Sequence, residues 1–282
     1  MFYIYRMRHI KLLIILLPAI VSITSCKKNV QFVCDEHYIN GFNYLFADNP
    51  DSAKSEFELS IKSNPQNANG YYGLGYYYFN AGENKKAIAA LDKAIELNPD
   101  FTLAYYADGT AKEMDGDSKG AISDFSKAID LKKDFALAYY QRGSQYSYTG
   151  DREDGIKDMD EVIKLRPEFY GAYYARGIYK SSLGDIKGAI DDYTKSLSFS
   201  KSINIYYNRG ILYGENKQYQ LAINDLTTAI NLKADIKMIY LYRGIYENDL
   251  GKKADACADF EKAKSLGVPK AEEYITSYCN GK

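Results

Sequence analysis

The residues best equipped for chemistry in this sequence are a cysteine and a histidine three positions apart, Cys34 and His37. A thiolate and an imidazole are good zinc ligands, so this pair would supply half of a metal site. The same histidine would have to serve any nucleophilic triad, because His9 is the only other histidine in the chain. The sequence has no glycine-rich loop of the kind that holds phosphates. The surrounding pattern must therefore decide whether these side chains have partners.

An internal repeat surrounds these residues. Glycines recur every 34 residues, with one interval of 33. Small residues form a second column 12 positions after each glycine and a third column seven positions further on. Three parallel columns indicate seven copies of one structural unit. The first column consists of Gly41, Gly75, Gly109, Gly143, Gly177, Gly210 and Gly244.

Each repeat divides into two helical halves. In the third repeat, apolar residues at helical spacing run from Leu103 to Met114, Gly116 ends this helix, and Asp117 can cap the next. Helices of this length are marginal alone in water, so stacking between repeats must stabilise them. We expect seven repeats over residues 34–269 and a capping helix over residues 270–282.

The columns resemble the tetratricopeptide-repeat family. In the second repeat the family pattern is carried, with tyrosine in place of the usual tryptophan, by Tyr71, Leu74, Gly75, Tyr78, Ala87, Leu91, Ala94 and Pro99. The resemblance implies an all-α, right-handed superhelical solenoid of two-helix repeats, with the first helices lining its concave side. His37 occupies a column that packs between helices in this family, which argues against a metal site.

The resemblance also implies that the concave side binds a protein or peptide. By register, that side carries a tyrosine stripe, and tyrosine is enriched at binding hot spots. The stripe consists of Tyr38, Tyr72, Tyr106, Tyr140, Tyr174 and Tyr207. Two alternatives remain open: the tyrosines pack on one another across repeats, or they form a stacking platform for a glycan or small ligand. We expect a scaffold with no enzymatic activity, no cofactor and no metal.

Arginines stand directly before the column glycine in repeats four to seven, and aspartates recur in the second helices. In the second repeat, Leu74 and Ala90 replace both residue types together. We hypothesise partly buried ion pairs within or between repeats; the other interpretation is two solvent-exposed faces. The residues are Arg142, Arg176, Arg209 and Arg243 with Asp124, Asp158, Asp192, Asp225 and Asp259.

The first residues have the pattern of an export signal. Arg6, Arg8 and Lys11 precede an apolar run over residues 12–23, which is shorter than the roughly 20 residues that span a bilayer. The following Cys26 completes a sequence that resembles the lipobox of bacterial lipoproteins. We expect a signal peptide over residues 1–25, lipidation at Cys26 and a tether over residues 26–33. Lys27 then favours the outer membrane of a Gram-negative bacterium over the inner membrane.

The remaining cysteines would lie in an oxidising compartment after export. Cys257 and Cys279 lie about ten residues before and after the turn at Gly267, so an antiparallel pair of helices would bring them level. We predict a disulfide, worth roughly 3 kcal/mol through restriction of the unfolded chain. Two buried free thiols are the alternative.

Charge and composition exclude one class of partner. The 36 Lys and Arg against 37 Asp and Glu leave a formal charge of -1, which offers no broad basic surface for nucleic acid. The function that these patterns favour is a lipid-anchored scaffold that holds a protein or peptide near the membrane, with assembly of a cell-envelope complex as its specific form. A glycan or small-ligand receptor is the alternative.

Overall fold

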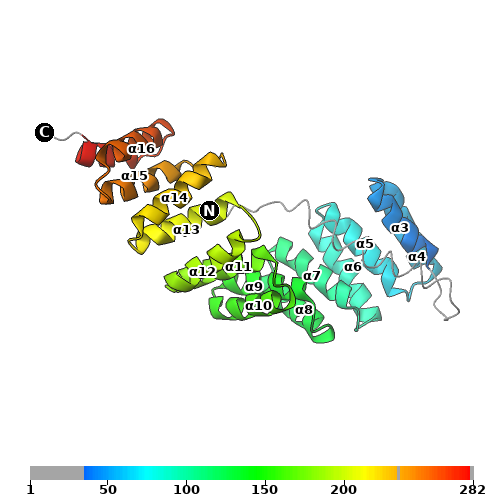
Figure 1. Ribbon diagram of the computed structural model, residues 1–282. Coiled ribbons are helices and arrows are strands. Elements are labelled where there is room, and N and C mark those ends of the chain that lie inside the picture. The colour runs from blue at the N-terminus through cyan, green and yellow to red at the C-terminus, as the bar shows by residue number, and fades with distance from the viewer. Residues whose placement is uncertain (1–34, 234–235, 280–282) are drawn as a thin grey trace. The chain divides into compact units, whose positions relative to one another are not determined.

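The computed structural model describes residues 35–233 and 236–279, and every regular element in these ranges is a helix (Figure 1). Seven helix pairs follow one another along the chain, as the repeat predicts. The export signal, Cys26, the tether and Cys34 lie outside the described residues. The pairs are α3 (Glu36–Phe46) and α4 (Pro50–Ser63), α5 (Ala68–Asn80) and α6 (Asn84–Leu97), α7 (Thr102–Asp115) and α8 (Ser118–Leu131), α9 (Ala136–Thr149) and α10 (Arg152–Leu165), α11 (Tyr170–Ser182) and α12 (Ile186–Leu197), α13 (Ile203–Glu215) and α14 (Tyr219–Asn231), and α15 (Met238–Asp249) and α16 (Lys253–Ser265).

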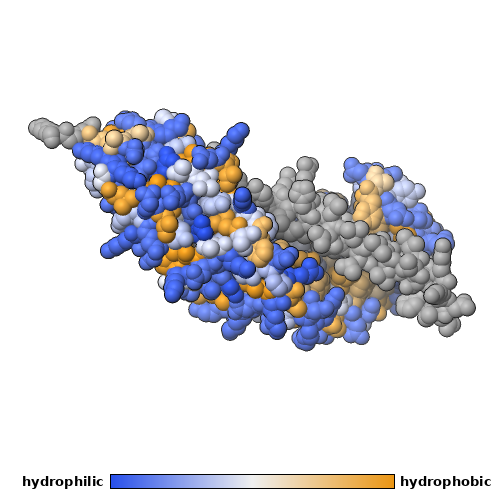
Figure 2. Space-filling model, in the orientation of Figure 1, coloured by the Kyte–Doolittle hydropathy of each residue, from blue (hydrophilic) through white to orange (hydrophobic). Residues whose placement is uncertain are grey.

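The chain divides into two compact units. Residues 1–133 form the first unit, and its described part holds the three pairs from α3 to α8. Residues 134–282 form the second unit, which holds the four pairs from α9 to α16 and a C-terminal segment. On the face of the second unit in view, apolar residues form small patches separated by polar ones (Figure 2).

The small-residue columns let the two helices of a pair approach closely. The column glycine of the first helix faces a large side chain and a small residue of the second helix. A Cβ added at Gly109 would lie 2.8 Å from Phe125 Cε1 and 3.2 Å from the Ala121 carbonyl oxygen. Only glycine fits this approach without displacing the second helix.

The turn between the two helices of each repeat requires a left-handed residue. Five repeats place glycine there, for example Gly116 with φ 90° and Gly150 with φ 106°. The first and sixth repeats place Asp48 and Lys217 at the same point, with φ 56° and 58°. These two residues adopt a backbone conformation that costs a non-glycine residue about 1 kcal/mol or more.

The second unit ends in a cap. Helix α17 (Ala271–Tyr274) and the π-helix η1 (Ile275–Cys279) follow α16. Ala271 and Ile275 bury their side chains against Leu241 and Phe260 of the last repeat. The expected C-terminal capping helix is therefore present over these residues, and its second half takes the wider π form.

None of the helices in the described ranges combines the length and apolarity that crossing a bilayer requires.

Candidate functional site

The tyrosine stripe is largely buried. Tyr72 is 1% exposed and Tyr106 is 3% exposed, so these two side chains present no surface to a ligand. The other four are partly buried. Burial raises the pKa of all six phenols, to about 12 at Tyr207. The expected binding surface is therefore corrected at Tyr72 and Tyr106, which belong to the core.

Packing between consecutive repeats explains this burial. The ring centroids of Tyr72 and Phe101 are 4.9 Å apart, and Phe101 lies at the N-terminus of the next repeat's first helix. The ring centroids of Tyr140 and Phe169 are 5.3 Å apart, and Phe169 has the same position in its own repeat. The Tyr174 hydroxyl accepts a hydrogen bond of 3.0 Å from Asn208 of the following repeat. Three of the stripe tyrosines thus join neighbouring repeats, through Phe101, Phe169 and Asn208 and not by packing on one another.

A different column on the first helices is exposed. The residue five positions after the column glycine is 49% exposed at Phe46, 60% at Met114 and 80% at Tyr148. Phe46 and Met114 belong to the first unit and Tyr148 to the second. We call the whole set the exposed column: Phe46, Asn80, Met114, Tyr148, Ser182, Glu215 and Asp249. Sequence reasoning missed it, although three large apolar residues at a position otherwise filled by polar ones were a usable signal.

Four arginines of the second unit form paired contacts with aspartates of the same repeat. In each pair the arginine Nε and Nη2 donate to the two carboxylate oxygens, a bidentate geometry. In the sixth repeat these distances are 2.7 Å and 2.8 Å, from Arg209 to Asp225. The other pairs are Arg142 with Asp158, Arg176 with Asp192 and Arg243 with Asp259. All four aspartates are buried.

The arginines of repeats five, six and seven also reach the preceding repeat. Arg176 Nη1 lies 2.5 Å from Asp160 Oδ1. Arg209 Nη1 donates to the Thr194 hydroxyl at 2.9 Å, and Arg243 Nη1 donates to the Thr227 hydroxyl at 3.0 Å. The pairs therefore link repeats as well as the helices within each repeat. We call this set of contacts the arginine ladder.

Asp124 has a different partner from the one its column suggests. In the third repeat the arginine position holds Asp108, a fully buried carboxylate. Lys112 Nζ lies 2.6 Å from Asp108 Oδ2 and 2.7 Å from Asp124 Oδ2, and it reaches Asp92 of the preceding repeat at 3.8 Å. Burial raises the pKa of Asp108 to about 8, although Lys112 opposes this shift. Sequence reasoning missed Asp108 and Lys112.

The first repeat gives its histidine a structural partner. His37 Nδ1 lies 2.7 Å from Glu56 Oε2 on α4. The neighbouring Asp35 caps α3 and accepts hydrogen bonds from Ser60 and Asn67. Across the described residues, no three His, Cys, Asp or Glu side chains gather where they could hold a metal ion.

The cysteine pair lies at the C-terminal end. The structure joins Cys257 of α16 to Cys279 of η1 by a disulfide, with their Cα atoms 5.6 Å apart. The bond fastens the cap to the last repeat. These are the two cysteines whose pairing we predicted from their equal distance from the turn at Gly267.

Parts of this chain match known proteins. Sequence profiles of the tetratricopeptide repeat match residues 68–101, 136–169 and 203–236. The crystal structure of MamA is 28% identical and has a TM-score of 0.54, over 56% of this chain and 93% of that one. The crystal structure of YrrB, described as a tetratricopeptide-repeat protein with an unusual peptide-binding site, is 21% identical with a TM-score of 0.59, over 65% and 95% of the two chains.

A further structure covers more of this chain. A tetratricopeptide-repeat protein from Parabacteroides merdae is 18% identical with a TM-score of 0.61, over 87% of this chain and 98% of that one. Among curated proteins, none matches. The tetratricopeptide-repeat models therefore match three segments of this chain, and the paired helices with their close-packed glycines extend the same architecture over the other described repeats.

Proposed function

We propose that the chain is an interaction scaffold and that its first helices bind a protein or peptide partner. Repeat proteins of this family are typically scaffolds without enzymatic activity, and the related YrrB is described as having a peptide-binding site. The exposed column carries the proposal. Phe46, Met114 and Tyr148 present large apolar side chains that the fold does not bury. Exposed apolar surface of this kind marks interaction sites.

We further propose that the scaffold is exported and anchored to a membrane through lipidated Cys26. The lipobox-like residues before Cys26 and the apolar run over residues 12–23 support the anchor. The disulfide between Cys257 and Cys279 supports an oxidising compartment. Lys27 favours the outer membrane, and assembly of a cell-envelope complex is the role that fits such an anchor.

The test for the partner is crosslinking in intact cells, followed by affinity isolation of the full chain. The variant combines Phe46→Ala, Met114→Ala and Tyr148→Ala. A matched control changes exposed leucines of second helices, Leu59→Ala and Leu221→Ala. We expect a partner that is captured by the wild type and the control and is lost in the triple variant. A partner retained by a folded triple variant would contradict the proposed role of these residues.

The anchor is tested separately by Cys26→Ser. We expect this variant to lose incorporation of a labelled fatty acid and to leave the membrane fraction. Lys27→Asp serves as a second variant, which keeps the acylated cysteine and should shift the protein towards the inner membrane. Membrane association that survives Cys26→Ser would rule out the lipid anchor.

A further inference from the structure

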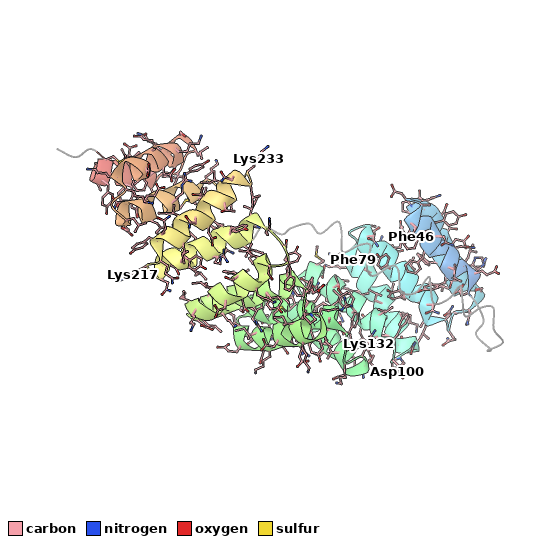
Figure 3. All side chains as sticks on the ribbon, in the orientation of Figure 1. Phe46, Phe79, Asp100, Lys132, Lys217 and Lys233 are labelled. Carbon is pink, nitrogen blue, oxygen red and sulfur yellow. A yellow bond between two sulfur atoms is a disulfide. The ribbon has the colours of Figure 1, made fainter. Side chains whose placement is uncertain are left out.

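The first helices of the first unit share one apolar edge. They run parallel, because each is followed by a returning second helix, and α5 contacts both α3 and α7. Their C-terminal ends therefore lie at the same edge of the unit. Phe46 closes α3, Phe79 lies in the last turn of α5, and Met114 lies in the last turn of α7. Figure 3 labels Phe46 and Phe79 at these helix ends. We call these three residues the apolar edge.

The last turns of α3, α5 and α7 present no outward-facing lysine or arginine, although the exposed Lys85 and Lys119 begin the returning helices α6 and α8. The C-terminus of a helix carries a partial negative charge, which a lysine or arginine in the last turn commonly offsets. The last turns of α3 and α5 hold no basic residue. Lys112 in the last turn of α7 is turned inward to Asp108 and Asp124. The apolar edge therefore lies beside negative helix ends that these turns leave without an outward cation.

Exposed carboxylates add to this negative charge. Asp48 follows the end of α3 and Asp115 is the last residue of α7, and both are exposed. Lys86, at the start of α6, is engaged by Glu83 and lies over the ring of Tyr78.

The described part of the first unit has the same sign. Residues 35–133 contain no arginine, and their aspartates and glutamates clearly outnumber their lysines. Every arginine after residue 34 belongs to the second unit, where acidic and basic residues nearly balance. Because a net field steers oppositely charged ligands towards a surface, the first unit favours cationic partners.

We propose that the apolar edge binds a basic segment of another protein, one that carries aromatic or aliphatic side chains next to lysines or arginines. This inference rests on the proposed scaffold function and names the chemistry of the partner. The apolar side chains of the segment pack on Phe46, Phe79 and Met114. Its cations face the helix ends, Asp48 and Asp115. Hot spots of this kind combine an apolar anchor with charge complementarity at the rim.

Binding of labelled synthetic peptides to the full chain carrying Cys26→Ser, followed by fluorescence anisotropy, tests this. One peptide alternates lysine with phenylalanine and leucine, a second replaces its lysines with glutamate, and a third keeps the lysines and replaces the apolar residues with serine. We expect the first peptide to bind at least about tenfold more tightly than either of the others. Its affinity should fall as salt rises, because screening weakens the charge term.

Two variants locate the site. Phe46→Ser with Met114→Ser should weaken the first peptide about tenfold, and so should Asp48→Lys with Asp115→Lys. Lysine is tolerated at the position of Asp48, because Lys217 occupies the equivalent turn of the sixth repeat. The matched control, Glu58→Lys with Leu59→Ser on the second helix α4, should leave the affinity unchanged.

Three results would overturn the inference. The first is equal binding of the glutamate peptide, and the second is loss of binding only in the α4 control. The third is a large gain in affinity when residues 27–33 are deleted, because that would identify this segment of the chain as the occupant of the apolar edge. A partner in cells that depends on the exposed column, together with no preference for basic peptides, would leave the scaffold function standing and remove only this inference. If no cellular partner depends on the exposed column and the chain also shows no preference for basic peptides, the proposed scaffold function and this inference are both contradicted.

Discussion

The two units satisfy the same pair of repeat positions in different ways. In the second unit the position before the column glycine is arginine four times, and each arginine holds a buried aspartate of its own repeat. In the first unit the same position is Asn40, Leu74 and then Asp108. The first unit therefore shows one exposed polar residue, one apolar pair and one lysine-bridged pair of carboxylates, where the second repeats a single arrangement.

This difference shows that the fold fixes where the two side chains meet but not what they are. In the second repeat both positions change, to Leu74 and Ala90. In the third repeat Asp124 is kept, and Lys112 from a neighbouring position offsets the charge of Asp108. Burial raises the pKa of Asp158 even though Arg142 opposes the shift, which indicates that pairing only partly offsets the loss of solvation. Removing one partner of such a buried ion pair costs much stability, whereas replacing both partners by apolar side chains need not.

The largest effect should come from breaking one rung of the arginine ladder. Arg209→Leu leaves Asp225 buried without its guanidinium, so we expect the free energy of unfolding to fall by about 3 to 5 kcal/mol. Adding Asp225→Ala reproduces the apolar pair of the second repeat and should recover most of that loss. Urea denaturation of both singles and the double completes a cycle. Additive losses would show that the two positions are independent.

Lys112→Met should be nearly as damaging in the first unit. One ammonium group serves Asp108 and Asp124, so its removal strands two buried carboxylates. We expect a loss of about 3 kcal/mol, because Asp108 can escape part of the penalty by staying protonated. Thermal unfolding measures the loss, and exposed Lys119→Met is the matched control. Equal stability of the two variants would remove Lys112 from its proposed structural role.

Glu247 occupies in the seventh repeat the position that Lys112 holds in the third. Its Oε2 is buried with no hydrogen-bond partner, and burial raises its pKa from 4.5 to about 7, with Asp259 adding to the shift and Arg243 opposing it. Since the folded pKa is above the unfolded one, the folded state binds more protons. Stability should therefore fall as the pH rises from about 4.5 to 7.

Glu247→Gln removes that pH dependence. We expect it to stabilise the chain by about 1 to 2 kcal/mol at pH 8, after allowing for solvent screening, and to have little effect at pH 4. Denaturation at the two pH values measures the difference. Exposed Glu273→Gln controls for the change in net charge. A variant that is destabilised at both pH values would show that the carboxylate is satisfied.

The smallest effect should come from the turns, and both units offer a test. Asp48→Gly and Lys217→Gly place glycine in a left-handed conformation that five other repeats already assign to glycine. We expect each to stabilise by less than about 1 kcal/mol, because relief of the strain exceeds the entropy cost of glycine. Gly150→Ala is the reverse control and should destabilise by about 1 kcal/mol. Thermal unfolding of the three variants measures these changes in stability.

The fold could be predicted because its determinants recur seven times. The glycine column and the small residues opposite it are local in sequence, and repetition separates them from chance. The Arg209 and Asp225 positions could also be paired in advance, because the second repeat replaces both types at once. Lys112 was missed, although Lys180 holds the same position of the fifth repeat and contacts Asp192 at 2.9 Å; the aspartate at position 108 has no second case among the repeats.

The tyrosine stripe was misread in part for a physical reason. Register places Tyr72 on the first helix, but its burial depends on Phe101, which arrives from the next repeat and covers the ring. Such cover depends on the spacing between repeats, which no single repeat encodes. The exposed column had a usable signal in the sequence that was missed, and the exposure of Phe46 and Met114 identified it.

The arginine ladder has one more consequence, because its contacts point in one direction. Arg176, Arg209 and Arg243 each reach back to the repeat before them. Asp160, Thr194 and Thr227 occupy the same position of successive repeats, so deleting an internal repeat in register presents its successor with the equivalent acceptor of the repeat before. Gene rearrangements that delete or duplicate one whole repeat inside the second unit should therefore keep an acceptor for the arginine at the new junction, whereas loss of the last repeat would also remove the surface on which the cap packs.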